Sequence, residues 1–151
     1  MIATASAPAS SAAQAARPGR GLAAGIVAAL LGALVFGIIQ GKIGHRGQEV
    51  GYWALCIGLL IGAVVGKLGG RVPLLALIGI PLALVSVSLA QLIGVAVQMG
   101  DQSSWPTADT LIDHFGLVAD YWRDRILGRN DITFYAVAGV ESYLVAKRIT
   151  E

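Results

Sequence analysis

The chain has 151 residues, of which 56% are hydrophobic and 13% are charged, and its mean hydropathy is +0.72. A soluble domain usually carries about a quarter charged residues, whereas the long apolar blocks found here are typical of membrane spans. The net charge of +2, without a run of basic residues interleaved with aromatics, argues against a nucleic-acid partner. The single cysteine, Cys56, excludes an internal disulfide and a paired-cysteine metal site.

Residues 1–20 are small, polar and repetitive, so we predict a disordered tail followed by a single membrane domain over residues 21–151. Apolar segments in that domain predict transmembrane helices over about 21–40, 50–67, 72–98 and 132–147. The second segment is short, so Lys67 is expected to snorkel, and Pro81 predicts a kink in the third. The fourth is the shortest and contains Glu141, so a re-entrant or interfacial segment is its alternative.

Four crossings place both termini on the same side of a cell membrane. Basic residues are slightly more numerous at the termini and in the turn after the second segment than in the other loops. The positive-inside rule therefore favours cytoplasmic termini. The expected fold is all-α: an integral membrane four-helix bundle with one extramembrane amphipathic helix.

Small residues recur at every fourth position of the first two apolar segments, which places them on one face of each helix. These positions are Gly25, Ala29, Ala33 and Gly37 in the first segment, and Ala54, Gly58, Gly62 and Gly66 in the second. Because lipid is as apolar as leucine, membrane helices are stabilised little by burying leucine side chains against each other. They are stabilised more by small-xxx-small faces, which let their backbones approach closely. We expect these glycine-zipper faces to join the first and second helices, with contact to another copy or another protein as the alternative.

Glu141 is the ionisable residue inside a predicted span, and an intramembrane acid is a candidate functional group by default. The competing interpretation is structural: the carboxylate reaches the interface or pairs with Lys67, Arg71 or Arg148. Ser86, Ser88 and Gln91 make the third segment mildly polar and are expected to form hydrogen bonds between helices.

Residues 108–127 have a helical period and predict an amphipathic helix that lies along the membrane surface or caps the bundle. Its apolar face is formed by Leu111, Ile112, Phe115, Val118, Ala119, Trp122 and Ile126. Thr110 and Asp113 resemble a capping box, and Trp105, Tyr121 and Trp122 suit a headgroup interface.

The opposite face of this predicted helix is acidic. It carries Asp109, Asp113, Asp120 and Asp124. Carboxylates one turn apart repel each other weakly, and a cation or a basic partner would relieve that repulsion. A solvated face is the expectation, and a cation or partner site is the alternative.

The stretch EVGYWALCIG, from Glu49 to Gly58, resembles a signature of small four-pass bacterial membrane proteins of actinobacterial type. In these proteins a disordered tail precedes one helix, and E-x-G-Y-x-A-x-G-I-G opens the second. The resemblance covers about residues 20–100, and Cys56 stands where the pattern has glycine. It implies the four-pass fold and carries no activity with it.

No enzyme motif is present: the sequence lacks G-x-S-x-G, a P-loop, H-E-x-x-H and paired cysteines. We therefore expect no catalytic residue, no cofactor and no metal. The expected function is a non-enzymatic scaffold or accessory subunit of a membrane assembly. Its partners would be membrane lipids and a membrane protein or a second copy. The alternative is a small-cation or proton transporter or channel that uses Glu141.

Overall fold

The protein is described from a computed structural model, in which residues 18–43, 50–69, 73–126 and 132–150 can be described. Over these residues the chain is helical and has no strand. The helices are α1 (Pro18–Ile43), α2 (Val50–Gly69), α3 (Pro73–Ser103), α4 (Thr107–Asp113), α5 (Phe115–Ile126) and α6 (Ile132–Thr150). Residues 18–20, which fall within the predicted disordered tail, belong to α1, and the rest of that tail lies outside the described residues.

Three of these helices are long and apolar enough to cross a membrane, namely α1, α2 and α3. The sequence therefore correctly predicts a helical chain with the character of a membrane protein. In the part of the chain that can be described, α6 does not join this group. It carries Glu141, Lys147 and Arg148 within its 19 residues.

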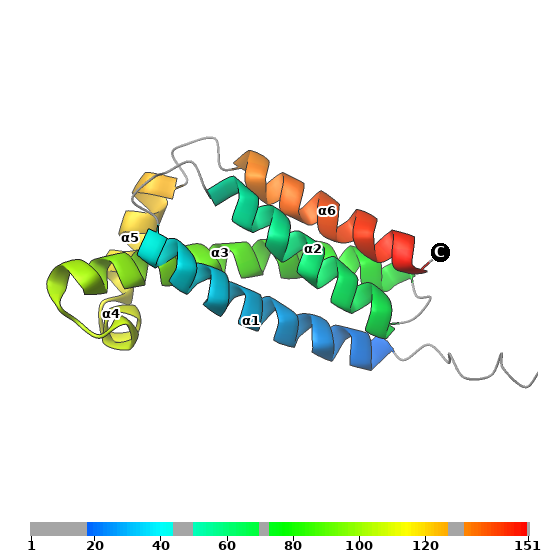
Figure 1. The fold of residues 1–151 in the computed structure, drawn as a ribbon, viewed down its shortest axis with the longest axis horizontal. Coiled ribbons are helices and arrows are strands. Elements are labelled where there is room, and N and C mark those ends of the chain that lie inside the picture. Colours follow the sequence, from blue (N-terminus) through cyan, green and yellow to red (C-terminus); the bar gives the residue numbers. More distant parts are fainter. Residues whose placement is uncertain (1–17, 44–49, 70–72, 127–131, 151) are drawn as a thin grey trace, which may run out of the picture.

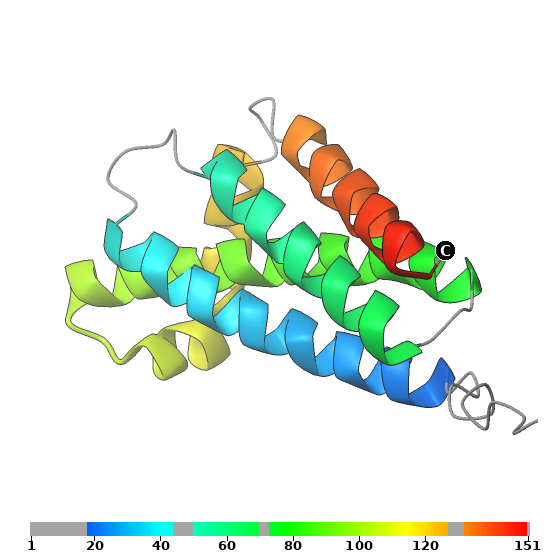
Figure 2. The ribbon, with the colours of Figure 1, turned by 45° about the vertical axis from the view of Figure 1, so that its right-hand side comes forward.

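The four long helices lie side by side, and α4 and α5 lie together at one end of them (Figures 1 and 2). The start of α1 and the end of α6 are found at the opposite end (Figure 1). α1 packs most extensively on α3, and α2 packs most extensively on α6. Ile57, Ile61 and Val65 of α2 are completely or almost completely buried at the centre.

The glycine face of α2 lies against α6, not against α1 as expected. A Cβ added at Gly58 would lie 2.6 Å from the carbonyl oxygen of Ala138, and one at Gly62 would lie 2.6 Å from that of Ser142. Gly66 is similarly close to Ala146. The expected pairing is wrong because a different face of α2, bearing Ile57, Ile61 and Val65, is the one turned to the central core.

The small face of α1 is directed mainly at α3. A Cβ at Gly37 would lie 2.7 Å from the carbonyl oxygen of Ala90, and Gly41 is in comparably tight contact with Gly94 and Val97. Ala29 and Ala33 are buried on the same face. Gly25 contacts both α2 and α3, through Val65 and Leu82. The two small faces thus serve two different helix pairs.

α3 is longer than predicted and ends at Ser103 in a Schellman motif. Ser104 has a φ of 59°, and the N–H of Trp105 donates to the carbonyl oxygen of Gly100 at 3.2 Å. This is the hydrogen bond that characterises the motif, in which the left-handed residue is usually glycine. Pro81 is accommodated within α3 and is exposed.

The predicted amphipathic helix over residues 108–127 is two helices, because α4 ends at Asp113 and α5 begins only after His114. This residue has φ −114° and ψ 25°, and its ring stacks on Trp105 with centroids 4.3 Å apart. The predicted capping box is also wrong. Thr110 lies inside α4 and donates its hydroxyl to the carbonyl oxygen of Pro106 at 3.1 Å, while the N-cap itself has no side-chain hydrogen bond.

The break at His114 divides the predicted apolar face. Val118 is fully buried against Val95 and Ala96 of α3. Ile112 and Phe115, which were placed on the same face, are 76% and 53% exposed. Because the chain changes direction between α4 and α5, one helical projection does not describe both.

Candidate functional site

Glu141 lies at the middle of α6, farther from the helix end than predicted because α6 continues to Thr150. Its side chain is half-buried, and its Oε2 atom is buried without a hydrogen-bond partner. Among the described residues no ion pair joins it to Lys67 or Arg148, and Arg71 lies outside these residues. The described contacts therefore do not include the predicted structural pair.

The position of Glu141 on α6 is at the border between a packed face and an exposed face. Ala138 and Val145, one turn away on either side, contact the glycines of α2. Val137 and Leu144, also one turn away, are exposed. The carboxylate thus lies beside the α2–α6 contact and not at the centre of the molecule.

A second polar group, centred on Gln91, links three helices. Gln91 of α3 is buried, and its Oε1 accepts hydrogen bonds from the Tyr135 hydroxyl of α6 at 2.6 Å and the Trp122 indole N–H of α5 at 3.0 Å. The Ser88 hydroxyl lies 3.4 Å from the Tyr135 oxygen. The Nε2 of Gln91 is buried and has no partner. This arrangement holds α5 and α6 to the same point of α3.

Two buried serines belong to the contacts between helices. The Ser86 hydroxyl of α3 donates to the carbonyl oxygen of Ala29 in α1 at 2.7 Å. Ser142 of α6 faces α3, where a Cβ at Gly79 would lie 2.8 Å from its Oγ. That Oγ has no hydrogen-bond partner. Ser86 and Gln91 thus make the hydrogen bonds between helices that the sequence predicts, and Ser88 contacts Tyr135 of α6.

The four aspartates of the predicted acidic face are divided between two helices. Asp109 and Asp113 lie on α4, Asp120 and Asp124 lie on α5, and all four are exposed. Within the described ranges, no group of three or more His, Cys, Asp or Glu side chains could hold a metal ion. A partner of this acidic face stays a prediction.

An ion pair connects the ends of α1 and α3. Lys42 Nζ lies 2.7 Å from Asp101 Oδ1, and both side chains are more than half exposed. Exposed pairs of this kind contribute about 0–1 kcal/mol. The pair therefore contributes little to stability, and it shows that the C-terminal ends of α1 and α3 lie close together.

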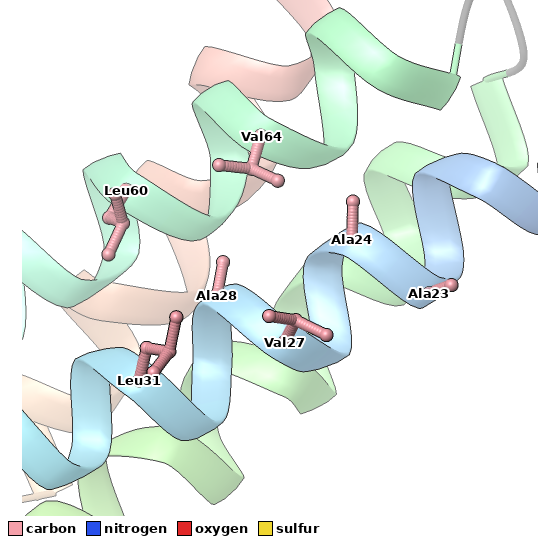
Figure 3. Close-up of a pocket in the computed structure, with 7 residues that line it drawn as sticks. All are labelled: Ala23, Ala24, Val27, Ala28, Leu31, Leu60 and Val64. Atoms are coloured by element: carbon pink, nitrogen blue, oxygen red, sulfur yellow. The ribbon is translucent and has the colours of Figure 1, made fainter.

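An open apolar groove of about 500 Å³ lies between α1 and α2 (Figure 3). Residues Ala23, Ala24, Val27, Ala28 and Leu31 of α1 line one side, and Leu60 and Val64 of α2 line the other. The groove has no polar lining, and Val27 and Leu31 are exposed. It is therefore suited to hydrocarbon and not to a charged or aqueous solute.

Comparison of the chain with protein-family models, with curated proteins and with solved structures found no match.

Sequence reasoning missed the partners of Gln91 and the groove. Trp122 was expected at a headgroup interface, yet its indole N–H donates to Gln91. Tyr135 lies in an apolar segment, and a buried tyrosine hydroxyl usually forms a hydrogen bond. Its presence there could have predicted a hydrogen-bond acceptor nearby. The groove could have been predicted from Ala24 and Ala28, because two small residues one turn apart leave a shallow surface on a second face of α1.

Proposed function

We propose that the chain is a four-pass, non-enzymatic membrane component that acts as a scaffold or accessory subunit. α6 supplies the fourth span, since its 19 residues extend about 28 Å and a hydrocarbon core is about 30 Å thick. Both ends of the membrane domain then face the same side, with α4 and α5 on the other. The resemblance around Glu49–Gly58 implies the same four-pass plan, and Glu49 lies outside the described residues.

The observation that carries this proposal is the close packing between helices. At Gly37, Gly58 and Gly62, an added Cβ would lie 2.6–2.7 Å from a carbonyl oxygen of the facing helix. Contacts this tight leave no space for a solute along the α1–α3 and α2–α6 seams. The buried Ser86 hydroxyl and the buried Gln91 Oε1 are hydrogen-bonded across helices. This interior favours a rigid support over a conduit.

Glu141 is the group through which a partner would bind. Its half-buried carboxylate lies beside the α2–α6 contact, at mid-membrane depth in the proposed topology. The basic residues of the four long helices, among those that can be described, lie in their first or last turns, as Lys67 and Arg148 do. The described part of a second copy therefore has no cation at the depth of Glu141. A different membrane protein that brings a Lys, an Arg or a hydrogen-bond donor to this depth fits better.

The proposal is tested by purification of the tagged full-length chain from its native membranes in mild detergent, followed by mass spectrometry. We expect a membrane protein to co-purify in a fixed ratio, and Glu141→Gln to reduce that ratio several-fold. Asp101→Asn, which removes an exposed carboxylate that lies near the end of α3 and outside the acidic face, is the matched control and should leave the ratio unchanged. Recovery of the chain without a stoichiometric membrane partner would overturn the scaffold proposal.

Transport of a proton or small cation is the second candidate, because the buried Oε2 of Glu141 has no partner in the described structure. A carboxylate in this state can exchange a proton or coordinate a cation if water reaches it. The test is flux into proteoliposomes that contain the purified chain. Flux that is present in the wild type and lost in Glu141→Gln would favour transport, and absence of wild-type flux would exclude it.

A further inference from the structure

Two basic residues, Arg20 and Lys67, lie one helical turn beyond the residues that line the apolar groove between α1 and α2. Arg20 precedes Ala23 and Ala24 by one helical turn, so it lies on the face of α1 that lines the groove. Lys67 follows Val64 by one turn and lies on the groove-lining face of α2. Both side chains are exposed. Each wall of the groove therefore ends in a cation.

The two cations lie at the same end of the molecule. α1 begins and α2 ends at this end (Figure 2). The backbones touch there, because a Cβ added at Gly21 would overlap the Cα of Gly69. Gly21 is adjacent to Arg20, and Gly69 is two residues beyond Lys67. In the proposed topology this end is the membrane surface, at headgroup depth.

We propose that this groove binds one anionic phospholipid, with an acyl chain between α1 and α2 and its phosphate between Arg20 and Lys67. The inference depends on the proposed membrane insertion of α1 and α2, and not on the partner of Glu141. The entirely apolar lining matches a hydrocarbon chain, and the two cations match a phosphate in a headgroup whose net charge is negative. Basic pockets between transmembrane helices bind anionic headgroups in this way.

A lipid fits this surface better than a helix of another protein does. Within the described residues neither Arg20 nor Lys67 has an ion-pair or hydrogen-bond partner. An apolar helix in the groove would leave both cations unmatched, whereas a phospholipid satisfies the groove and the cations together. The wall formed by Ala23, Ala24 and Ala28 is also shallow, which leaves room for a flexible chain.

The experiment is native mass spectrometry of the delipidated full-length chain, titrated with phosphatidylglycerol and with phosphatidylcholine of identical acyl chains. We expect the first phosphatidylglycerol to bind more tightly than the first phosphatidylcholine. Removal of both charges in the variant Arg20→Gln/Lys67→Gln should weaken phosphatidylglycerol binding about 30-fold, or about fivefold for each charge, and abolish the preference.

Two control variants separate the roles of charge and groove. Lys42→Gln removes a cation at the other end of α1, where Lys42 is paired with Asp101, and should leave the lipid preference intact. Ala28→Leu fills the groove from a half-buried position on its wall. It should weaken the binding of both lipids equally and leave the circular dichroism spectrum unchanged. If Ala28→Leu lowers the helix content, Ala23→Leu at an exposed position of the same wall replaces it.

Equal affinity of the wild type for the two lipids, or an unchanged phosphatidylglycerol affinity in the double variant, would overturn the proposal. Extraction of the chain from membranes by alkaline carbonate would overturn membrane insertion itself. A chain that stays in the membrane, selects phosphatidylglycerol and has no protein partner would retain the lipid site and lose only the scaffold function.

Discussion

Gly62 and Gly32 are both buried glycines in the interior of long helices, yet their surroundings differ. A Cβ at Gly62 would lie 2.6 Å from the carbonyl oxygen of Ser142, which is part of a backbone and cannot rotate away. A Cβ at Gly32 would lie 3.5 Å from Leu60 Cδ2, which is an ordinary contact distance. The role of each glycine is thus set by the facing helix and not by its own sequence neighbourhood.

Substitution of these two glycines by alanine should change the stability of the protein in opposite directions. Gly62→Ala should destabilise the protein by about 1–3 kcal/mol, because α2 and α6 must separate to admit the methyl group. Gly32→Ala should be neutral or stabilise it by up to about 1 kcal/mol, because alanine is the better helix former and the methyl group fits. Thermal unfolding in detergent measures both. Equal effects would mean that the α2–α6 contact is looser than described.

Tyr135 and Tyr143 offer a matched pair on α6. Tyr135 donates a hydrogen bond to the buried Gln91, whereas no hydrogen bond of Tyr143 is found among the described residues. Tyr135→Phe should lower the free energy of unfolding by about 0.6–2 kcal/mol, the range for hydrogen bonds between membrane helices. Tyr143→Phe should leave it within about 0.5 kcal/mol. A larger loss at Tyr143 in detergent unfolding would contradict the assigned role of Gln91.

The sequence predicts individual buried polar residues well and their partners poorly. Gln91 and Ser86 stand out because they are polar in an apolar segment, and both make hydrogen bonds between helices. The partners are a tyrosine 44 positions away and a main-chain carbonyl 57 positions away. Such pairs are created by tertiary packing, which no local pattern encodes.

The Schellman motif at the C-terminal end of α3 can be tested by substitution of its left-handed residue. Ser104 adopts a left-handed φ of 59°, which disfavours residues with a Cβ. Ser104→Gly should therefore stabilise the end of α3, by up to about 1 kcal/mol. Ser103→Gly, inside the helix, should be neutral or destabilising by a similar amount. Hydrogen exchange of the Trp105 amide, which donates to Gly100, measures the local change, and faster exchange in Ser104→Gly would contradict the motif.

The break between α4 and α5 shows where helical periodicity misleads. Residues 108–127 contain no proline, and their apolar residues continue in one register across His114. The break instead accompanies tertiary contacts: His114 stacks on Trp105, and Val118 docks on Val95 and Ala96 of α3. α4 alone is too short to be stable in isolation, so its direction depends on these contacts.

For the whole molecule, the sequence predicts the existence and order of the long helices better than their pairing. Runs of apolar residues determine where α1, α2 and α3 lie in the sequence. The centres of these helices therefore agree with those of the predicted spans. The prediction that α1 and α2 join through their small faces followed from the short connection between them. It is wrong because Gly58, Gly62 and Gly66 fit the small side chains of α6, a partner that is distant in sequence.

The proposed topology makes a prediction about the two ends of the molecule. In a Cys56→Ser background, Asp120→Cys on α5 and Arg148→Cys on α6 should react with a membrane-impermeant thiol reagent from opposite sides of the membrane. Both original side chains are exposed, so the new thiols will be accessible. Labelling of sealed and of inverted vesicles distinguishes the sides. Reaction of both thiols from one side would mean that α6 does not cross.

In the proposed topology, the length of α3 determines how far its C-terminal end, with α4 and α5, extends from the membrane. Its 31 residues extend about 46 Å, well beyond a hydrocarbon core of about 30 Å. Val95 and Ala96, on which α5 docks, lie in the last third of this helix, and Asp101 is tied to Lys42. α4 and α5 are thus attached to the last third of one long helix. If α3 crosses the membrane as proposed, a change in its tilt that follows a change in bilayer thickness will move α4 and α5 with it.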